Sequence, residues 1–170
     1  EGMDKSLGDL LANLDRHGIA DNTIVLFMSD NGGLSVHGRG GTPNTHNAPL
    51  SSGKGSAHEG GIRVPMIVRW PGVAEPASTC GRPVIIEDFF PTILEMAGVK
   101  ATKTLQRVDG VSFVPLLNRT SAQPTERAFY WHYPNNWGPK GPGIGASSTI
   151  RRGDWKLIYY HADQHYELFN

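Results

Sequence analysis

The first third of the chain passes from a helical pattern of apolar residues to an unbroken apolar run. Apolar side chains recur at helical spacing over residues 3–14, and Gly18 follows as a typical helix stop. Residues 23–28 are then β-branched or apolar at nearly every position, without the alternation of a half-exposed strand. Such a run is typical of a strand covered on both faces, as in a parallel α/β sheet. The order of helix and strand predicts a doubly wound α/β arrangement.

The middle of the chain predicts a long loop, a second strand and two helices. Residues 32–61 lack periodicity and are rich in Gly, Ser, Thr, Asn and His, and a loop of this length inside a compact domain usually carries function. Residues 65–70 form another apolar run, which Pro-Gly closes. Residues 86–98 and 112–118 predict helices, the first ending at Gly98.

The last part of the chain has the pattern of a small antiparallel sheet. Aromatic and β-branched residues dominate 127–134, 148–160 and 166–170, with turn residues between them. The tripeptide Arg-Gly-Asp at 152–154 is interpreted as a hairpin turn rather than an adhesion signal, because so short a motif carries little information.

Composition excludes two classes of partner. The 170 residues carry 16 Lys or Arg against 16 Asp or Glu, so no basic field for nucleic acid exists. No apolar run approaches the roughly 20 residues of a membrane span. Cys80 is the single cysteine, so no disulfide can form within the chain. The chain opens without Met and stops on a strand-like "YELFN", so we expect both ends to be cuts in a longer protein.

Polar residues follow the first predicted strand directly. Asp30 and Asn31 come just past its carboxyl end, where open α/β sheets place their ligands. Gly32 and Gly33 let the backbone turn sharply there. Taken alone, Asp-Asn-Gly is also ordinary turn chemistry.

The predicted loop contains one cation between two glycines. Lys54 lies between Gly53 and Gly55, so the backbone there can approach a ligand closely. The motif of a nucleotide phosphate loop fails, because Ala48 occupies the earlier glycine position and Gly55 replaces Ser or Thr. The "HEGGI" at 58–62 lacks the second His of a zinc protease, and its two glycines disfavour a helix.

Together these groups are suited to an anion. Carboxylate and amide oxygens at Asp30 and Asn31 fit Ca²⁺ or Mg²⁺ rather than a soft metal, although two ligands cannot fill the coordination shell. A Lys and a unit anion ~4 Å apart attract by about 4 kcal/mol at an effective dielectric constant of ~20. A divalent ion beside Lys54 therefore predicts a site that orients an oxyanion and stabilises charge on it.

Four ordered motifs carry a resemblance to a known family. They are "TIVLFMSDNGG", "GKGSAHEGGIRVPMIVRWPG", "EDFFPTILEMAG" and "DGVSFVPLL", and the resemblance continues through "RRGDWKLIYY" and "YELFN". In this order they resemble the type I, formylglycine-dependent, arylsulfatase-like sulfatases of the alkaline-phosphatase-like superfamily. The resemblance implies an α/β fold: residues 1–120 form the C-terminal part of an alkaline-phosphatase-like sheet sandwiched by helices. Residues 121–170 form a small antiparallel α+β subdomain.

The resemblance also implies roles for residues. Asp30 and Asn31 match ligands of one Ca²⁺ ion, and Asp30 also lies beside the nucleophile as a catalytic residue. Lys54 matches a catalytic residue that contacts the substrate sulfate. Glu59 and Arg63 are expected to hold the loop to the fold rather than touch substrate, since a buried Arg is usually paired.

Several further residues have two open interpretations. His58 stands where the family often has an aromatic residue and Ser51–Ser52 where it often has a basic one, so they either tune the pocket or pack the loop. Candidates for substrate selection, because function concentrates in variable loops, are His37, Arg39, His46 and Asn47. Aromatic residues that either rim the pocket or pack in the core are Trp131, His132, Tyr133 and Trp137.

The family nucleophile is a formylglycine made from Cys or Ser in a Cys/Ser-x-Pro-x-Arg motif. Cys80 does not match, because in "CGRPV" the Pro comes one place too late. We therefore expect the motif in a missing N-terminal part, without which this chain is an inactive fragment of a sulfuric ester hydrolase. The expected substrate is a sulfate ester, such as a sulfated carbohydrate, and the expected location is periplasmic or secreted. Two alternatives remain open: a phosphatase or phosphonate monoester hydrolase of the same superfamily, and a non-catalytic domain that binds sulfated glycans.

Overall fold

The computed structural model describes most of the chain as two compact units. The described residues are 1–35, 47–99, 104–118, 126–136, 138 and 140–170. By their contacts they group into a first unit, Glu1–Phe27 with Ile67–Pro124, and a second unit, Met28–Met66 with Thr125–Asn170. This grouping follows contacts in space, and the boundary between residues 120 and 121 stays a prediction. No helix in the described ranges is long and apolar enough to cross a membrane.

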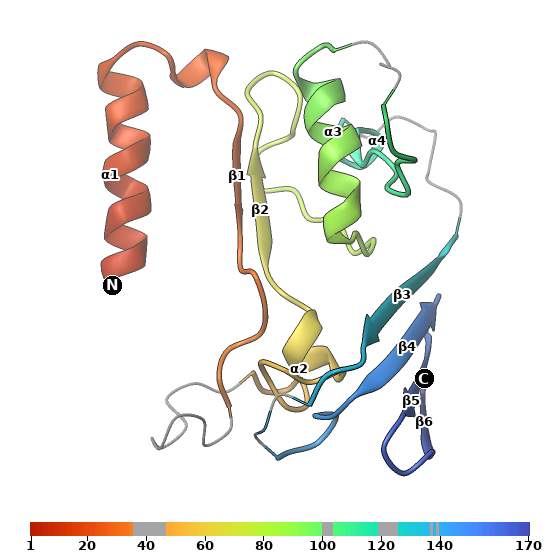
Figure 1. Cartoon of the computed structure of the whole chain (residues 1–170). Helices are drawn as coiled ribbons and strands as arrows, with labels where there is room; N and C mark the ends of the chain where they lie inside the picture. The colour runs from red at the N-terminus through yellow and green to blue at the C-terminus, as the bar shows by residue number, and fades with distance from the viewer. Residues whose placement is uncertain (36–46, 100–103, 119–125, 137, 139) are drawn as a thin grey trace. The chain divides into compact units, whose positions relative to one another are not determined.

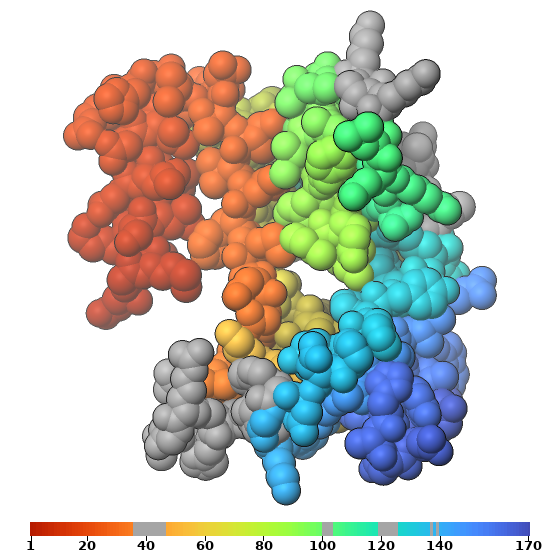
Figure 2. Space-filling model, viewed as in Figure 1, coloured from red at the N-terminus to blue at the C-terminus, as the bar shows by residue number. Residues whose placement is uncertain are grey.

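The first unit begins with the helix that the apolar spacing predicts. Helix α1 (Gly2–Arg16) ends before Gly18, which takes the left-handed conformation at φ 67°. No residue of α1 is buried, and its side chains are visible along its length in Figure 2. The sequence correctly predicts the helix, but its apolar residues are at most half-buried among the described residues.

Both predicted strands of the first unit form, and they pair with each other. Strand β1 (Val25–Met28) and strand β2 (Met66–Arg69) make a two-stranded sheet. The two strands run in opposite directions (Figure 1), whereas the unbroken apolar run at residues 23–28 was compared with a strand of a parallel sheet. The residues of both strands are half-buried, except Ile67, which is exposed, so the expected cover on both faces is not present among the described residues. An apolar run also does not encode strand direction. The Arg69 guanidinium secures the start of the sheet by donating to the carbonyl of Ala20 in η1 (Ala20–Asn22) at 2.8 Å.

The helices of the first unit form around a buried carboxylate. The predicted helix over 86–98 is observed as η2 (Ile86–Asp88) and α3 (Phe89–Met96), and the predicted helix over 112–118 as α4 (Val114–Leu117). Asp88 is 1% exposed and accepts hydrogen bonds from the backbone N–H of Ile85 at 3.0 Å and of Val111 at 2.9 Å. This carboxylate therefore joins the segment before α4 to the start of α3.

The second unit contains the predicted antiparallel sheet, which has four strands. Its order is β3-β4-β5-β6, with neighbouring strands adjacent in the sequence. The strand bounds are β3 Ala128–Tyr133, β4 Ser147–Arg152, β5 Trp155–Tyr160 and β6 Tyr166–Phe169. The hairpin interpretation of Arg-Gly-Asp is confirmed, because Gly153 lies in the turn between β4 and β5 with φ 56°.

A one-turn helix lies where the sequence predicts only loop. Helix α2 (Glu59–Ile62) includes Gly60 and Gly61, so the expectation that the glycines prevent a helix is wrong. Both glycines are buried, and an added Cβ would lie 2.3 Å from the Ser52 carbonyl oxygen at Gly60 and 2.1 Å from that of Ser56 at Gly61. Close packing of backbone on backbone overrides helix propensity here.

Candidate active site

The turn after β1 packs directly on α2. Asp30 and Asn31 follow the strand, and the Asn31 carbonyl accepts the Ser29 hydroxyl at 2.8 Å. The Gly32 N–H then donates to the Gly61 carbonyl at 2.9 Å. A Cβ at position 32 would lie 1.7 Å from the Gly60 carbonyl oxygen, so only glycine allows this approach. The Asp-Asn-Gly turn is therefore fixed in place by α2.

The loop that carries Lys54 is joined to the same turn. We call residues 51–58 the Lys54 loop. The Lys54 N–H donates to the Gly33 carbonyl at 3.1 Å, which brings the two predicted parts of the site together. The side chains of Asp30 and Lys54 are exposed and that of Asn31 is partly buried, so all three remain accessible to a ligand.

Asn47 strengthens this junction. Its Oδ1 accepts the Gly33 N–H at 3.0 Å, and its Nδ2 donates to the carbonyls of Gly33 at 3.1 Å and Ser52 at 2.9 Å. The amide of Asn47 is thus used to hold the turn against the Lys54 loop, whereas the sequence made it a candidate for substrate selection. The other candidates, His37, Arg39 and His46, lie outside the described residues.

Glu59 fastens α2 to the sheet, as expected from the sequence. Its carboxylate lies 2.8 Å from the Lys156 ammonium and 3.4 Å from the Arg151 guanidinium. Burial alone would raise the pKa of Glu59, but the hydrogen bond and charge of Lys156, together with Arg151 and Arg63, hold the pKa below its usual value. The expectation of a buried Arg63 is wrong, because its side chain is exposed.

His58 links the Lys54 loop to the last strand. Its ring is 8% exposed, with Nδ1 3.0 Å from Ser51 Oγ and Nε2 2.8 Å from Glu167 Oε2. The ring also meets Phe169 edge-on at 5.1 Å between centroids. Of the two interpretations left open for His58, the structure favours loop packing.

Glu167 accepts a second donor. The Tyr160 hydroxyl donates to Glu167 Oε2 at 2.6 Å. Burial raises the pKa of Tyr160, and the neighbouring Glu167 raises it further. Burial would also raise the pKa of Glu167, but the hydrogen bonds from Tyr160 and His58 hold it below its usual value. The candidates predicted from the sequence do not include Glu167, Tyr160, Lys156 or Arg151. All four lie on predicted strands, and the alternate spacing of Lys156 and Tyr160 on one strand was the available signal.

The loop before β4 closes the other side of the Lys54 loop. The Ser56 hydroxyl donates to the Pro142 carbonyl at 2.9 Å, and the Ala57 N–H donates to the Gly143 carbonyl at 2.9 Å. Gly143 leaves no room for a Cβ, which would lie 2.4 Å from the His58 ring. Residues 51–58 therefore contact three segments: the turn after β1, the loop before β4, and β6.

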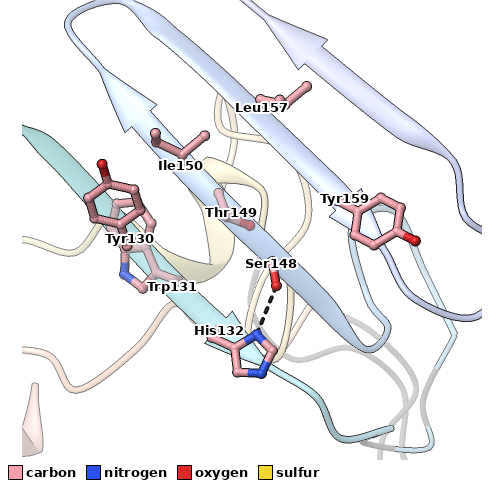
Figure 3. A pocket seen from close by; sticks show the side chains of 8 residues that line it. All are labelled: Tyr130, Trp131, His132, Ser148, Thr149, Ile150, Leu157 and Tyr159. Atoms are coloured by element: carbon pink, nitrogen blue, oxygen red, sulfur yellow. Dashed lines mark hydrogen bonds between the residues drawn. The ribbon is translucent and has the colours of Figure 1, made fainter.

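The strand aromatics divide between the two faces of the sheet. Trp131 stacks on Phe129 with centroids 6.3 Å apart, and the Lys156 ammonium lies 5.9 Å from its ring, which is a packing role. His132 lies on the other face, where its Nδ1 is 2.8 Å from Ser148 Oγ (Figure 3). Tyr133 is exposed, and Trp137 lies outside the described residues.

A shallow hollow of about 470 Å³ lies on the sheet and does not include the predicted site residues (Figure 3). The residues that line it are Tyr130, Trp131, His132, Ser148, Thr149, Ile150, Leu157 and Tyr159. The strand aromatics thus line a surface of the sheet, and their role at a substrate pocket stays a prediction.

The donor set after β1 is compatible with a hard cation. Asp30 and Asn31 are consecutive residues of an accessible turn, and carboxylate and amide oxygens of this kind suit Ca²⁺. Two adjacent donors are fewer than the six to eight oxygens that Ca²⁺ takes. No cluster of three or more His, Cys, Asp or Glu able to hold a metal occurs among the described residues. Asp30 and Asn31 therefore fit as a part of a calcium site that needs further ligands.

Two family profiles match the chain. One described as "Sulfatase" matches residues 1–99, and one described as "N-sulphoglucosamine sulphohydrolase, C-terminal" matches residues 53–170. Together they extend over the whole sequence and overlap over residues 53–99, which include Lys54.

Curated relatives are also sulfatases. A sulfatase from Formosa agariphila is 34% identical over 186 residues, which cover 100% of this chain and 32% of the relative. Rat steryl-sulfatase is 37% identical over 169 residues, covering 94% of this chain and 27% of the relative. An N-acetylglucosamine-6-O-sulfatase from Bacteroides thetaiotaomicron is 31% identical over 164 residues, covering 95% of this chain and 26% of the relative. The chain thus spans less than a third of the length of these relatives.

Solved structures share the fold. BT4656 in complex with its substrate D-glucosamine-2-N,6-O-disulfate matches with a TM-score of 0.72 and 29% identity, over 98% of this chain and 31% of that one. A phosphonate monoester hydrolase from Silicibacter pomeroyi matches with a TM-score of 0.68 and 24% identity, over 98% and 32%. At 24% identity, the match to the phosphonate monoester hydrolase shows a shared fold and nothing about activity. The expected alkaline-phosphatase-like α/β fold is confirmed.

Proposed function

Because this chain belongs to the sulfatase family, we propose that it supplies the sulfate-binding lysine and part of the calcium site of a sulfuric ester hydrolase. In this proposal Lys54 binds the sulfate group of a sulfate ester, and Asp30 and Asn31 ligate Ca²⁺. The attacking group comes from another part of the protein, because Cys80 lies outside any nucleophile motif. The chain is inactive alone.

The observation that carries the proposal is the junction of the two motifs. The Lys54 N–H donates to the Gly33 carbonyl at 3.1 Å, and Asn47 bonds both sides of this contact. The backbone that carries Lys54 is thereby joined to the backbone that carries Asp30 and Asn31. Preorganised charge of this kind stabilises an oxyanion without reorganisation during the reaction.

Lys54, Asp30 and Asn31 have separate tasks in the proposed mechanism. Lys54 keeps its ammonium group exposed on a loop with glycine on either side, so a tetrahedral anion can approach it closely. The ammonium binds and orients the sulfate and stabilises the charge that develops on its oxygens. Ca²⁺, when bound at Asp30 and Asn31, supplies further positive charge for the same oxygens. The Asp30 carboxylate keeps a negative group next to the position that the attacking group must reach.

The test is the replacement of Lys54 in the intact protein. Lys54→Ala is expected to lower kcat/KM for 4-nitrophenyl sulfate by about 10²-fold or more, since a charge that stabilises the transition state is lost. The matched control is Lys5→Ala, because Lys5 is exposed on α1 and pairs with the exposed Asp9 one helical turn away. Unchanged kcat and KM in Lys54→Ala would remove this residue from the site. Faster turnover of 4-nitrophenyl phosphonate esters than of sulfates would favour the phosphonate hydrolase alternative.

A further inference from the structure

We infer that Glu167 on β6, acting through His58, positions the Lys54 loop for sulfate binding. This inference rests on the proposed function, because the position of the loop matters for catalysis only if Lys54 binds the sulfate. Glu167 and His58 are positioning residues in this role and do not touch the substrate. The contacts that carry the inference all lie within the second unit.

The two ends of the Lys54 loop are bonded to each other, and we call this pair of residues, Ser51 and His58, the neck of the loop. Ser51 and His58 are its first and last residues, and Ser51 Oγ lies 3.0 Å from His58 Nδ1. The Gly60 N–H donates to the Ser51 carbonyl at 2.8 Å, which joins the same end of the loop to α2. The contact between Ser51 and His58 therefore sets the positions of both ends of the loop, in addition to the bond of the Lys54 N–H to Gly33 within it.

Glu167 fixes this neck to the sheet. Its Oε2 lies 2.8 Å from His58 Nε2 although the two residues are 109 positions apart in the sequence. Glu167 is paired across the sheet with Ile158, which is fully buried, and its Oε2 also accepts the Tyr160 hydroxyl at 2.6 Å. The acceptor for His58 is therefore held by a strand and a second hydrogen bond rather than by a free loop.

The carboxylate also determines how His58 bonds Ser51. An ionised carboxylate only accepts hydrogen bonds, so His58 Nε2 carries the proton that Glu167 accepts. In the neutral imidazole Nδ1 is then the acceptor for the Ser51 hydroxyl. Removal of Glu167 would free the ring to turn or change tautomer, and the contact with Ser51 would lose its direction.

The same three residue types occur in serine hydrolases, but the arrangement here differs. In a catalytic triad the acid bonds Nδ1 of the histidine and the serine bonds Nε2. Here Glu167 bonds Nε2 and Ser51 lies at Nδ1. The geometry points to a structural link between loop and sheet rather than to a nucleophilic serine.

Lys54 depends on tertiary contacts, because the glycines on either side leave its backbone few local restraints. Its own N–H bonds the Gly33 carbonyl at 3.1 Å, and the two ends of its loop are held through Ser51 and His58. Gly53 and Gly55 flank it, and Gly55 takes a positive φ of 86°. Glycine gives the backbone a wide choice of conformations, so the loop needs tertiary contacts to keep one of them. A displacement of about 1 Å in a group that binds the reacting centre can cost roughly 10²-fold in rate.

The experiment is a double-mutant cycle in the intact protein. His58→Ala and Glu167→Ala are each expected to lower kcat/KM for 4-nitrophenyl sulfate by about 10–100-fold, since Lys54 is misplaced. In a Lys54→Ala background the same changes should have little further effect, because they act through Lys54. Added imidazole should restore part of the activity of His58→Ala. Hydrogen exchange of residues 51–58 should become faster in Glu167→Ala.

Controls and conservative variants keep the test decisive. His17→Ala and Glu95→Ala replace exposed residues of the same types outside the site and should leave activity and exchange unchanged. If an alanine variant does not fold, Glu167→Gln and His58→Gln keep the volume and are measured in its place. Full losses in the Lys54→Ala background, or unchanged exchange of residues 51–58, would overturn the inference. Covalent labelling of Ser51 by a fluorophosphonate would also overturn it, because Ser51 would then be a nucleophile.

The outcomes separate this inference from the proposed function. Full activity in Lys54→Ala refutes the sulfate-binding role of Lys54 itself. A severe loss in Lys54→Ala with normal activity and normal exchange in Glu167→Ala refutes only the positioning role.

Discussion

The Lys156 ammonium lies 2.8 Å from Glu59 Oε1, although the two residues are 97 positions apart in the sequence. Lys156 is 4% exposed, so this pair brings a buried charge of β5 onto α2. Since α2 holds the turn that carries Asp30 and Asn31, the ion pair connects the sheet to the candidate site.

Breaking this pair should destabilise the protein strongly. Glu59→Ala is expected to lower the free energy of unfolding by about 3 kcal/mol, because it leaves a buried Lys156 without its partner. The measurement is urea unfolding of the intact protein. The matched control is Asp9→Ala, which removes an exposed partner of Lys5 and should change stability by less than about 1 kcal/mol. Equal effects of the two variants would contradict a buried, stabilising role for Glu59.

The charges of Glu59 and Glu167 should make stability depend on pH in the acidic range. The pKa of each carboxyl is lower in the folded protein than its ordinary value of 4.5. Their contribution is therefore present above about pH 4.5 and is lost as the pH falls through the lower folded pKa. Unfolding measured from pH 7 to pH 3 should show less stability at acidic pH. In Glu59→Gln the decline should be smaller, and an unchanged slope would contradict the assignment.

The close approach of Gly32 to α2 predicts a sharp effect of one added methyl group. In Gly32→Ala the new Cβ would lie 1.7 Å from the Gly60 carbonyl oxygen, so the turn with Asp30 and Asn31 must move. We expect a loss of sulfatase activity of about 10²-fold, with lower thermal stability. Gly8→Ala is the control, because nothing lies within 4 Å of its added Cβ; in the helix interior it should stabilise the protein by about 0.5–1 kcal/mol. Normal activity in Gly32→Ala would show that the turn does not need its present position.

Calcium should stabilise the intact protein through Asp30. Addition of Ca²⁺ to chelator-treated protein is expected to raise the thermal midpoint, because an ion that binds the folded state alone stabilises it. Asp30→Ala should remove most of this rise, whereas Asp4→Ala on the exposed helix α1 should not. The 170-residue chain by itself should bind Ca²⁺ weakly, since it offers too few oxygen ligands. A micromolar dissociation constant for the isolated chain, measured by calorimetry, would contradict this.

The fold was predictable where the cause is local. Helical spacing located α1, apolar runs located β1 and β2, and the Arg-Gly-Asp turn located the β4–β5 hairpin. Strand direction was not predictable, because an apolar run does not encode which neighbouring strand it pairs with or in which direction. Helix α2 was missed because the packing of its two glycines, rather than propensity, allows it to form.

The candidate site was likewise predictable where residue types and motifs are sufficient, and not where the partners of a side chain lie far along the chain. The residue types of Asp30, Asn31 and Lys54, together with the family resemblance, identified them as candidates from the sequence. The interpretations of Asn47 and Arg63 were less successful, because a side chain's partners depend on residues far along the chain. Asn47 is occupied by the backbone of Gly33 and Ser52, and Arg63 is exposed.

The sequence by itself determined the family, the order of elements and the chemical groups available for an oxyanion, because these follow from motifs and local patterns. Only the tertiary structure decided what holds Lys54 in place. The contacts of His58 with Glu167 and of Glu59 with Lys156 each span about 100 residues. Such contacts arise when a sheet packs against a loop, and no periodicity along the chain encodes which strand residue will meet which loop residue.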